Sequence, residues 1–314
     1  MSVVSYIKIA RFDHWVKQLF VIPGIVFAFF MHQSALQHYS SFLLPVLIGL
    51  LATGLIASAN YVINEWLDAE FDQFHPVKKF RPVVTKNLKV SIIIFEYIFL
   101  LFVGLGLAYL FLPETVFVME IILAVMGIIY NVRPFRSKDY PYIDVLSESL
   151  NNSIRLLIGW FLISPDVFPP ISIVLGYWMG GAFLMATKRF AEYRMINNPS
   201  TAALYRKSFQ FYTEESLLLS SFFYALLSVF FVGIFLVKYR MELLFAIPVL
   251  CGLFCLYLKL AYHPDSVVQK PEKLFHEKKL MLYCVFFVVL VCVLLFIEIP
   301  GVKLFYDTTL LDIR

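Results

Sequence analysis

Residues 64–82, NEWLDAEFDQFHPVKKFRP, place a dense run of charge between two long apolar stretches. The acids are Glu65, Asp68, Glu70 and Asp72, and the cations are Lys78, Lys79 and Arg81. The chain around them is 61% hydrophobic and only 15% charged over 314 residues, with a mean hydropathy of +0.80. A soluble domain carries about 25% charged residues. The composition therefore predicts an all-α, polytopic membrane protein, with this polar run at the edge of a membrane helix.

Apolar windows long enough to cross a bilayer recur along the chain and predict nine transmembrane helices in one domain, residues 1–314. The expected spans are 16–31, 42–64, 90–112, 114–131, 143–164, 170–188, 216–237, 243–262 and 280–300. Only Pro113 and Glu114 separate the third span from the fourth, which predicts a tight helical hairpin.

The loops between these spans alternate in charge. Most of the 26 Lys and Arg residues fall before span 1 or after spans 2, 4, 6 and 8, whereas the opposite side holds only Lys238, Arg240, Lys303 and Arg314. Cytoplasmic loops are enriched in Lys and Arg. We therefore expect a cytoplasmic N-terminus, an external C-terminus, and residues 64–82 on the cytoplasmic side.

Asn64, Asp68 and Asp72 are spaced four residues apart. On a helix this spacing places all three on one face over ~12 Å. Such a row of oxygen ligands suits Mg²⁺, which takes one or two carboxylates together with phosphate oxygens. The alternative is a helix end that simply becomes solvated. Glu65 and Glu70 are expected to point away from this row, Glu65 less so.

His75, Lys78, Lys79 and Arg81 follow the acidic row directly. A metal held by carboxylates beside fixed cations is what a diphosphate group requires, because the metal and the cations bind different phosphate oxygens. The basic half alone could instead contact anionic lipid headgroups.

A second row repeats the four-residue spacing at Asp144, Glu148 and Asn152 on the fifth span. Spans 2 and 5 run in opposite directions, so packing them together would bring both acidic ends to the cytoplasmic mouth. Two such patches can hold Mg²⁺ ions around one diphosphate. Arg155 lies deeper in the membrane and is interpreted either as a functional group or as an ion pair with Glu148 or another interior acid.

A third charged element, TKRFAEYR, ends span 6 with Lys188, Arg189 and Glu192 within little more than one helical turn. The general enrichment of Lys and Arg in cytoplasmic loops can by itself explain such a run. Beside two acidic rows on the same membrane face, it is a candidate for binding a substrate phosphate.

These features together resemble the UbiA superfamily of intramembrane prenyltransferases: NxxxDxxxD on span 2, a second acidic motif after YNVRPFRSKDYPYID, and the predicted topology. The resemblance implies a helical bundle open sideways to lipid, two Mg²⁺-binding acidic motifs, and transfer chemistry that displaces diphosphate. The stretches RFDHWVKQLFV, HPVKKFRPV, KRFAE and YRKSFQFYT look like the decaprenyl-phosphate phosphoribosyltransferase group, which uses 5-phosphoribosyl 1-diphosphate and a polyprenyl phosphate. YNVRPFRSKDYPYID looks closer to members that use prenyl diphosphates, which keeps that alternative open.

Motif and resemblance together define the predicted site. The expected catalytic residues are Asp68, Asp72, Asp144 and Glu148, and these four with Asn64 are the expected metal ligands. The expected substrate-binding residues are Asn64, Lys17, His75, Lys78, Lys79, Arg81, Tyr130, Arg136, Lys138, Asn152, Arg155, Lys188, Arg189 and Glu192.

The predicted function is a Mg²⁺-dependent membrane transferase that acts on a polyprenyl lipid with diphosphate as leaving group. The first expectation is phosphoribosyl transfer to a polyprenyl phosphate, and the alternative is prenyl transfer from a polyprenyl diphosphate to an aromatic or other small acceptor. A lipid or ion transporter and a purely structural subunit are the non-enzyme alternatives. Membrane lipids are expected partners and nucleic acid is not; the expected location is a bacterial inner membrane, with the oligomeric state left open.

Overall fold

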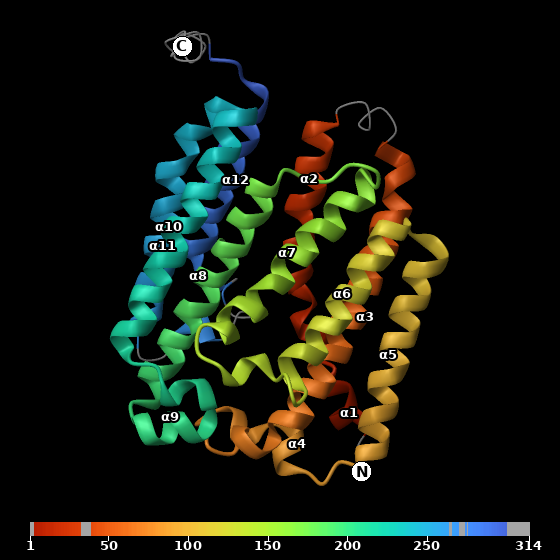
Figure 1. Cartoon of the computed structure of the whole chain (residues 1–314), viewed down its shortest axis with the longest axis vertical. Coiled ribbons are helices and arrows are strands. Elements are labelled where there is room, and N and C mark those ends of the chain that lie inside the picture. The colour runs from red at the N-terminus through yellow and green to blue at the C-terminus, as the bar shows by residue number, and fades with distance from the viewer. Residues whose placement is uncertain (1–2, 33–38, 264–265, 270–273, 275, 300–314) are drawn as a thin grey trace.

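The computed structural model describes residues 3–32, 39–263, 266–269, 274 and 276–299, and this part of the chain contains helices and no strand. Figure 1 shows the long helices side by side, with the short helices α1, α4 and α9 gathered at one end of the bundle. The α-helices are α1 (Val3–Ile9), α2 (Ile22–Met31), α3 (Tyr39–Asp72), α4 (Pro82–Thr85), α5 (Val90–Phe111), α6 (Glu114–Asn131), α7 (Ile143–Ile163), α8 (Ile171–Ile196), α9 (Pro199–Tyr205), α10 (Glu214–Tyr239), α11 (Ile247–Ala261) and α12 (Lys278–Phe296). The short 3-10 helices are η1 (Phe12–Val21), η3 (Lys78–Phe80), η4 (Ser137–Asp139), η5 (Lys207–Gln210), η6 (Met241–Ala246) and η7 (Val267–Gln269).

Within the described residues, each of the nine predicted spans coincides with a long helix or with a 3-10 helix that runs into one, and residue 300 of the last span lies outside them. Eight of these helical segments, within the described residues, are long and apolar enough to cross a membrane. The exception is α7, which carries Asp144, Glu148 and Arg155. The all-α membrane fold is thus confirmed, while the count of nine crossings stays a prediction.

The surface of the bundle suits lipid. Large apolar side chains stand exposed on the outer helices, including Phe102 on α5 and Phe296 on α12, each 77% exposed. Water would penalise such surfaces, whereas a bilayer accommodates them. The chain is an integral membrane protein.

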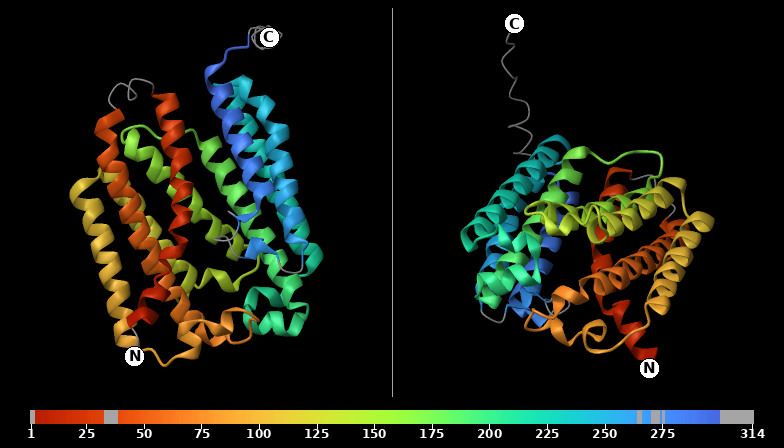
Figure 2. Two further views of the ribbon diagram at one scale, coloured as in Figure 1. Left: turned by 180° about the vertical axis from the view of Figure 1, so that it is seen from behind. Right: turned by 60° about the horizontal axis from the view of Figure 1, so that its bottom comes forward.

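Four apolar clusters hold the described helices together, and the two largest lie on either side of the bundle. One joins α2, α3, α6 and α7 around Ile158 and Phe161, and the other joins α8, α10, α11 and α12 around Phe183 and Tyr257. The two views in Figure 2 show α7 lying between the early helices and the α8–α12 group. Of the long helices, α7 has the largest fraction of buried residues. Its polar row is therefore enclosed by protein rather than by lipid.

Two helix ends extend beyond the predicted spans and, together with two short helices, form the end of the bundle that carries the site. The span predicted at 42–64 is part of α3, which continues to Asp72, and the span predicted at 170–188 is part of α8, which continues to Ile196. The chain from Pro199 to Gln210 then folds back as α9 and η5. The hairpin between α5 and α6 turns at Pro113, as predicted.

Candidate functional site

The row on α3 forms one wall of a polar pocket. Asn64 donates a 3.2 Å hydrogen bond from Nδ2 to Oδ2 of Asp68, and Asp68 and Asp72 border the same pocket. The helical continuation of α3 beyond the apolar segment is what carries both carboxylates to this position. The predicted shared face of the three residues is therefore present.

Cations from two neighbouring loops meet these carboxylates. Asp68 lies 2.5 Å from Lys138 Nζ and 2.9 Å from Arg136 Nη2. Burial lowers the pKa of Lys138 to about 8, although the attraction of Asp68 acts in the opposite direction. Asp72 accepts a 2.6 Å hydrogen bond from Arg81, whose Nε lies 3.5 Å from Glu65. Glu65 was expected to point away, but Arg81 links it to the row.

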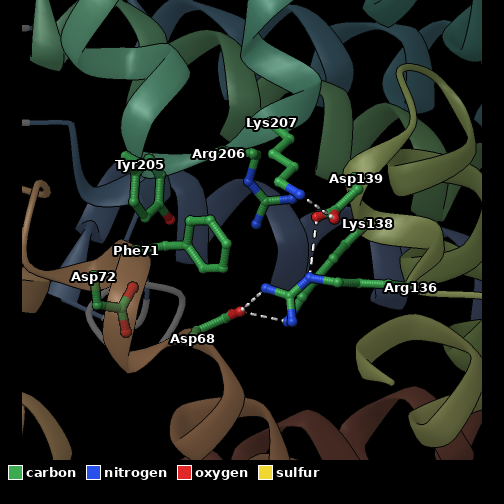
Figure 3. Close-up of a pocket in the computed structure, with 9 residues that line it drawn as sticks. All are labelled: Asp68, Phe71, Asp72, Arg136, Lys138, Asp139, Tyr205, Arg206 and Lys207. Carbon is green, nitrogen blue, oxygen red and sulfur yellow. Dashed lines mark hydrogen bonds and ion pairs between the residues drawn. The ribbon is translucent and has the colours of Figure 1, made fainter. Parts of the chain in front are cut away.

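The pocket is drawn in Figure 3. It is lined by Asp68, Phe71, Asp72, Arg136, Lys138, Asp139, Tyr205, Arg206 and Lys207. Four cations face three carboxylates here, so the lining suits a strongly anionic ligand such as diphosphate, accompanied by a divalent cation. An aromatic wall, Phe71 and Tyr205, closes one side (Figure 3).

The row on α7 faces α8 and η5. Asp144 is fully buried and is held by Tyr212 Oη at 2.8 Å, Ser208 Oγ at 3.1 Å, and the guanidinium groups of Arg189 and Arg206. A carboxylate enclosed by four donors has little room for a metal ion. This enclosure favours an anchoring role for Asp144 over the predicted metal ligation.

Glu148, one turn further along α7, lies among the groups predicted to bind substrate. It accepts a 2.9 Å hydrogen bond from Tyr130 Oη, contacts Arg189, and lies 3.6 Å from Lys188 Nζ. On α8, the Glu192 carboxylate contacts Arg189. It also forms an ion pair with Lys78, with 2.8 Å between Lys78 Nζ and Glu192 Oε1. The chain Lys78–Glu192–Arg189–Glu148 connects the loop after α3 to α7.

The two acidic rows therefore meet through cations rather than through a direct carboxylate contact. Arg206 borders the pocket with Asp68 and Asp72 and also reaches Asp144 at 3.5 Å. Burial disfavours its charge, but Tyr130, Tyr205 and the nearby acids outweigh that effect and raise the Arg206 pKa well above its usual range.

Some predicted residues lie outside this pocket. Lys79 is exposed, with its ammonium 5.2 Å from the centre of the Phe80 ring. Asn152 is buried against Gly181 of α8. His75 is buried, and its Nδ1 accepts hydrogen bonds from the backbone N–H groups of Val77 and Lys78, so it organises the loop. Burial and the neighbouring Lys78 lower the His75 pKa to about 3.

Several site residues were missed in the sequence. Tyr205, Arg206 and Lys207 line the pocket, and Ser208 and Tyr212 bind Asp144. All five belong to or adjoin the stretch YRKSFQFYT. That stretch carried the family resemblance, but its separation from both acidic rows gave no local sign of where it would fold.

The described protein side chains alone do not supply a full set of ligands for a metal ion. Among the described residues, no group of three or more His, Cys, Asp or Glu side chains is placed to hold one. Asp68 and Asp72 do border one pocket, and two carboxylates are what Mg²⁺ usually takes from a protein when phosphate oxygens and water complete its octahedron. The residues fit a metal that arrives with a phosphorylated ligand.

This is the architecture of a polytopic membrane protein with a pocket lined by carboxylates and cations at one end of its bundle. The model of the UbiA prenyltransferase family matches residues 20–290, and the chain belongs to that family.

Named relatives agree with the predicted branch. The chain is similar to a decaprenyl-phosphate phosphoribosyltransferase of Mycobacterium tuberculosis, with 26% identity over 215 residues, 68% of each chain. It is also similar to the enzyme of that name from Corynebacterium glutamicum, with 27% identity over 67% of this chain and 60% of the relative, and to protoheme IX farnesyltransferase 2 of Bacillus subtilis, with 27% identity over 51% and 53%. The resemblance to the phosphoribosyltransferase-like branch is confirmed, and the chain is a transferase.

A solved structure shares the fold. A UbiA homologue from Archaeoglobus fulgidus bound to GPP and Mg²⁺ superposes with a TM-score of 0.67 at 18% identity, over 92% of this chain and 99% of that chain. The family membership sets aside the transporter and structural-subunit alternatives.

Proposed function

We propose that this protein, as one transferase domain of residues 1–314, transfers a phosphoribosyl group from 5-phosphoribosyl 1-diphosphate to a polyprenyl phosphate. The observation that carries the proposal is the similarity to decaprenyl-phosphate phosphoribosyltransferases over two thirds of the chain. The pocket supports it, because Asp68 and Asp72 face a group of Lys and Arg side chains suited to diphosphate.

In this proposal the cations bind and stabilise the leaving group. The C1–O bond to diphosphate breaks, and the electron pair leaves on the diphosphate oxygen. Arg136, Lys138 and Arg206 then stabilise the charge that develops there. A lipid phosphate oxygen forms the new bond to C1.

Asp68 and Asp72 would hold Mg²⁺, which supplies electrostatic stabilisation of the same departing charge when bound. Glu148 lies between Tyr130 and Arg189 and would present negative charge toward the oxocarbenium-like carbon. Burial of the site excludes water, which would otherwise capture that carbon.

Prenyl transfer from a polyprenyl diphosphate to a small acceptor is the second candidate. It is favoured by the similarity to a protoheme IX farnesyltransferase and by the fold shared with a homologue bound to GPP and Mg²⁺. The same pocket would hold the diphosphate in either reaction.

We also propose that the pocket faces the cytoplasm of a bacterial cell from the inner membrane. The charge bias supports this orientation, since Lys78, Arg136 and Arg206 all lie at the pocket end of the bundle.

Product analysis tests the reaction. The purified protein is incubated with Mg²⁺, a short polyprenyl phosphate and 5-phosphoribosyl 1-diphosphate, and in parallel with a prenyl diphosphate and 4-hydroxybenzoate. Mass spectrometry of the lipid fraction is expected to show the phosphoribosyl lipid in the first reaction only. A prenylated acceptor without that lipid would instead support the second candidate.

A further inference from the structure

A second cavity opens beside the end of α3. It is bounded by Trp66 and Glu70 of α3, by Lys86 and Leu88 before α5, and by Arg133 after α6, and we call it the lateral cavity. Its volume of about 610 Å³ is in the range of cavities that bind small ligands. None of these five residues lines the pocket in Figure 3. The lateral cavity is therefore a separate binding space.

The two cavities use opposite faces of α3. Trp66 and Glu70 are four residues apart, so they share one face of the helix. Asp68 is two residues from each of them and points away from that face, because successive residues of a helix turn by about 100°. Arg136 lines both cavities, but its charge is already compensated by Asp68 at 2.9 Å and Asp139 at 3.1 Å. The uncompensated charge of the lateral cavity must come from its other residues.

Two cations of the lateral cavity lack an acidic partner. Among the described residues, neither Lys86 nor Arg133 has a carboxylate within 4 Å, and Lys86 Nζ instead lies 2.9 Å from Ser5 Oγ. The amide of Asn87 adds a neutral hydrogen-bond donor. The one acid in the lining, Glu70, is exposed and is not paired with either cation. Donors without acidic partners suit a ligand that carries a negative charge.

The surroundings of the lateral cavity favour a lipid over a soluble anion. Apolar side chains, among them Trp66 and Ile93, line the cavity beside its cations. Phe95 follows Ile93 by two residues on α5 and is 68% exposed on the apolar outer surface of the bundle. A headgroup bound at Lys86 and Arg133 thus leaves its acyl chains beside a surface that suits lipid. Basic pockets at the ends of membrane helices are typical binding sites for anionic headgroups.

We propose that Lys86 and Arg133 bind the phosphate-bearing headgroup of an anionic membrane phospholipid in the lateral cavity, with its acyl chains along α5. The bound lipid is not a substrate, so the inference goes beyond the proposed function and does not depend on it. Arg136 connects this headgroup to the transferase pocket, because its guanidinium group borders both cavities and holds Asp68.

Tryptophan quenching by brominated lipids tests the site, because Trp66 borders the cavity. The full-length protein is reconstituted, without donor or acceptor substrate, in phosphatidylcholine vesicles that contain increasing fractions of dibrominated phosphatidylglycerol. Dibrominated phosphatidylcholine measures non-selective lipid contact. The wild type is expected to be quenched at a lower fraction of phosphatidylglycerol than of phosphatidylcholine. This difference should disappear in Trp66→Phe, which shows that the selective signal arises at the cavity.

Charge variants then test the two cations. Lys86→Gln and Arg133→Gln are each expected to weaken selective phosphatidylglycerol binding about 5-fold, the usual contribution of one cation beside an anionic lipid, and the double variant about 20-fold. Lys86→Arg and Arg133→Lys keep the charge and should retain most of the selectivity. Lys89→Gln is the matched control and should bind like the wild type, since Lys89 is an exposed cation of the same loop that does not line the cavity.

Equal quenching by the two brominated lipids in the wild type would overturn the proposal, and so would unchanged selectivity in the double variant. An equal loss in Lys89→Gln would also overturn it, because general surface attraction would then explain the binding. Full reversal of the selective quenching by glycerol 1-phosphate would assign the cavity to a soluble phosphate ester. Failure of the proposed function would look different: no phosphoribosyl lipid would form, while the selective quenching remained.

Discussion

At the scale of single residues, similar carboxylates have different surroundings. Asp68 borders the pocket, although Lys138 and Arg136 hold it. Asp144 belongs to the other row and is fully enclosed by its donors. We propose that the first exchanges a protein cation for a metal and a substrate, whereas the second holds Arg189 and Arg206 in place.

Asp68→Asn is expected to lower turnover at least ~100-fold, because an electrostatic group needed for catalysis is typically worth that much. Mass spectrometric product formation measures the effect, and size-exclusion profiles in detergent check the fold. Glu70→Gln, an exposed acid two residues away, is the control and should keep full activity. Retention of more than about a tenth of the activity in Asp68→Asn would argue against its metal role.

His75 should make the folded protein sensitive to acid. Burial lowers its folded pKa to about 3, whereas an unfolded His titrates near 6.5. Between these two pKa values, His75 is protonated in the unfolded chain but neutral in the folded chain. The free energy of unfolding therefore falls as pH falls from about 6.5 toward 3. Between pH 6.5 and 5 this effect amounts to about 2 kcal/mol of unfolding free energy.

His75→Asn keeps a hydrogen-bond acceptor and removes the titration. Denaturant titrations in detergent at pH 6.5 and pH 5 should show a smaller acid-induced loss for this variant than for the wild type. Identical losses in the two proteins would contradict a neutral, buried His75.

At the scale of elements, close helix crossings bring the polar rows together. Gly24 of α2 and Gly159 of α7 lie where η1 and α2 cross α7: a Cβ on Gly24 would overlap the Leu156 carbonyl oxygen of α7, and one on Gly159 would overlap the Val21 carbonyl oxygen at the end of η1. Small residues allow membrane helices to approach closely. This crossing positions α7, and with it Glu148 and Arg155.

Gly24→Ala and Gly159→Ala are each expected to destabilise the protein by about 1–3 kcal/mol, the usual cost of overpacking. Thermal unfolding in detergent measures the change. Gly106→Ala on α5 is a matched control, because an added Cβ there meets nothing within 4 Å. If all three variants unfold alike, the α2–α7 contact is looser than described.

Asp144 ties three elements together, since its partners come from α8, from η5 and from the segment before α10. Asp144→Asn leaves Arg189 and Arg206 without this charge, and breaking a buried ion pair typically costs about 3–5 kcal/mol. We expect a lower unfolding temperature and poor recovery from the membrane. Asp166→Asn, at an exposed loop position, should have no such effect. A stable but inactive Asp144→Asn protein would instead point back to metal ligation.

At the scale of the whole molecule, the α7 helix decides the topology. It is as long as its neighbours, but its polar row makes it less apolar than the other eight segments. The surrounding helices cover this row, so α7 can cross the membrane inside the protein.

Cysteine labelling tests this topology in a variant whose four native cysteines are replaced. A membrane-impermeant maleimide should label Asp166→Cys and Lys238→Cys on intact spheroplasts, but Lys79→Cys and Arg133→Cys only after lysis. All four positions are exposed. If Asp166→Cys also requires lysis, α7 does not cross and the predicted orientation of the later helices is wrong.

The fold was largely predictable, because hydrophobic length and helical periodicity are local properties of the chain. The α3 row and its neighbours Lys138 and Arg81 were found by spacing and proximity to predicted helix ends. Arg206 was not assigned, since nothing in its own segment shows that α9 and η5 fold back over the pocket. The link between Glu65 and Asp72 was not predicted for a similar reason: a loop arginine, Arg81, contacts both carboxylates, although Glu65 does not share the helix face of the row.

By itself the sequence determined that this is a helical membrane protein with acidic rows and cations at one end, because those features depend on the order of neighbouring residues. Only the tertiary structure decided which charges neutralise one another. Asp144 is enclosed while Arg155 lacks an acidic partner among the described residues, although both lie on α7. That difference arises from helices far apart in the chain, whose packing sets which charge each side chain meets.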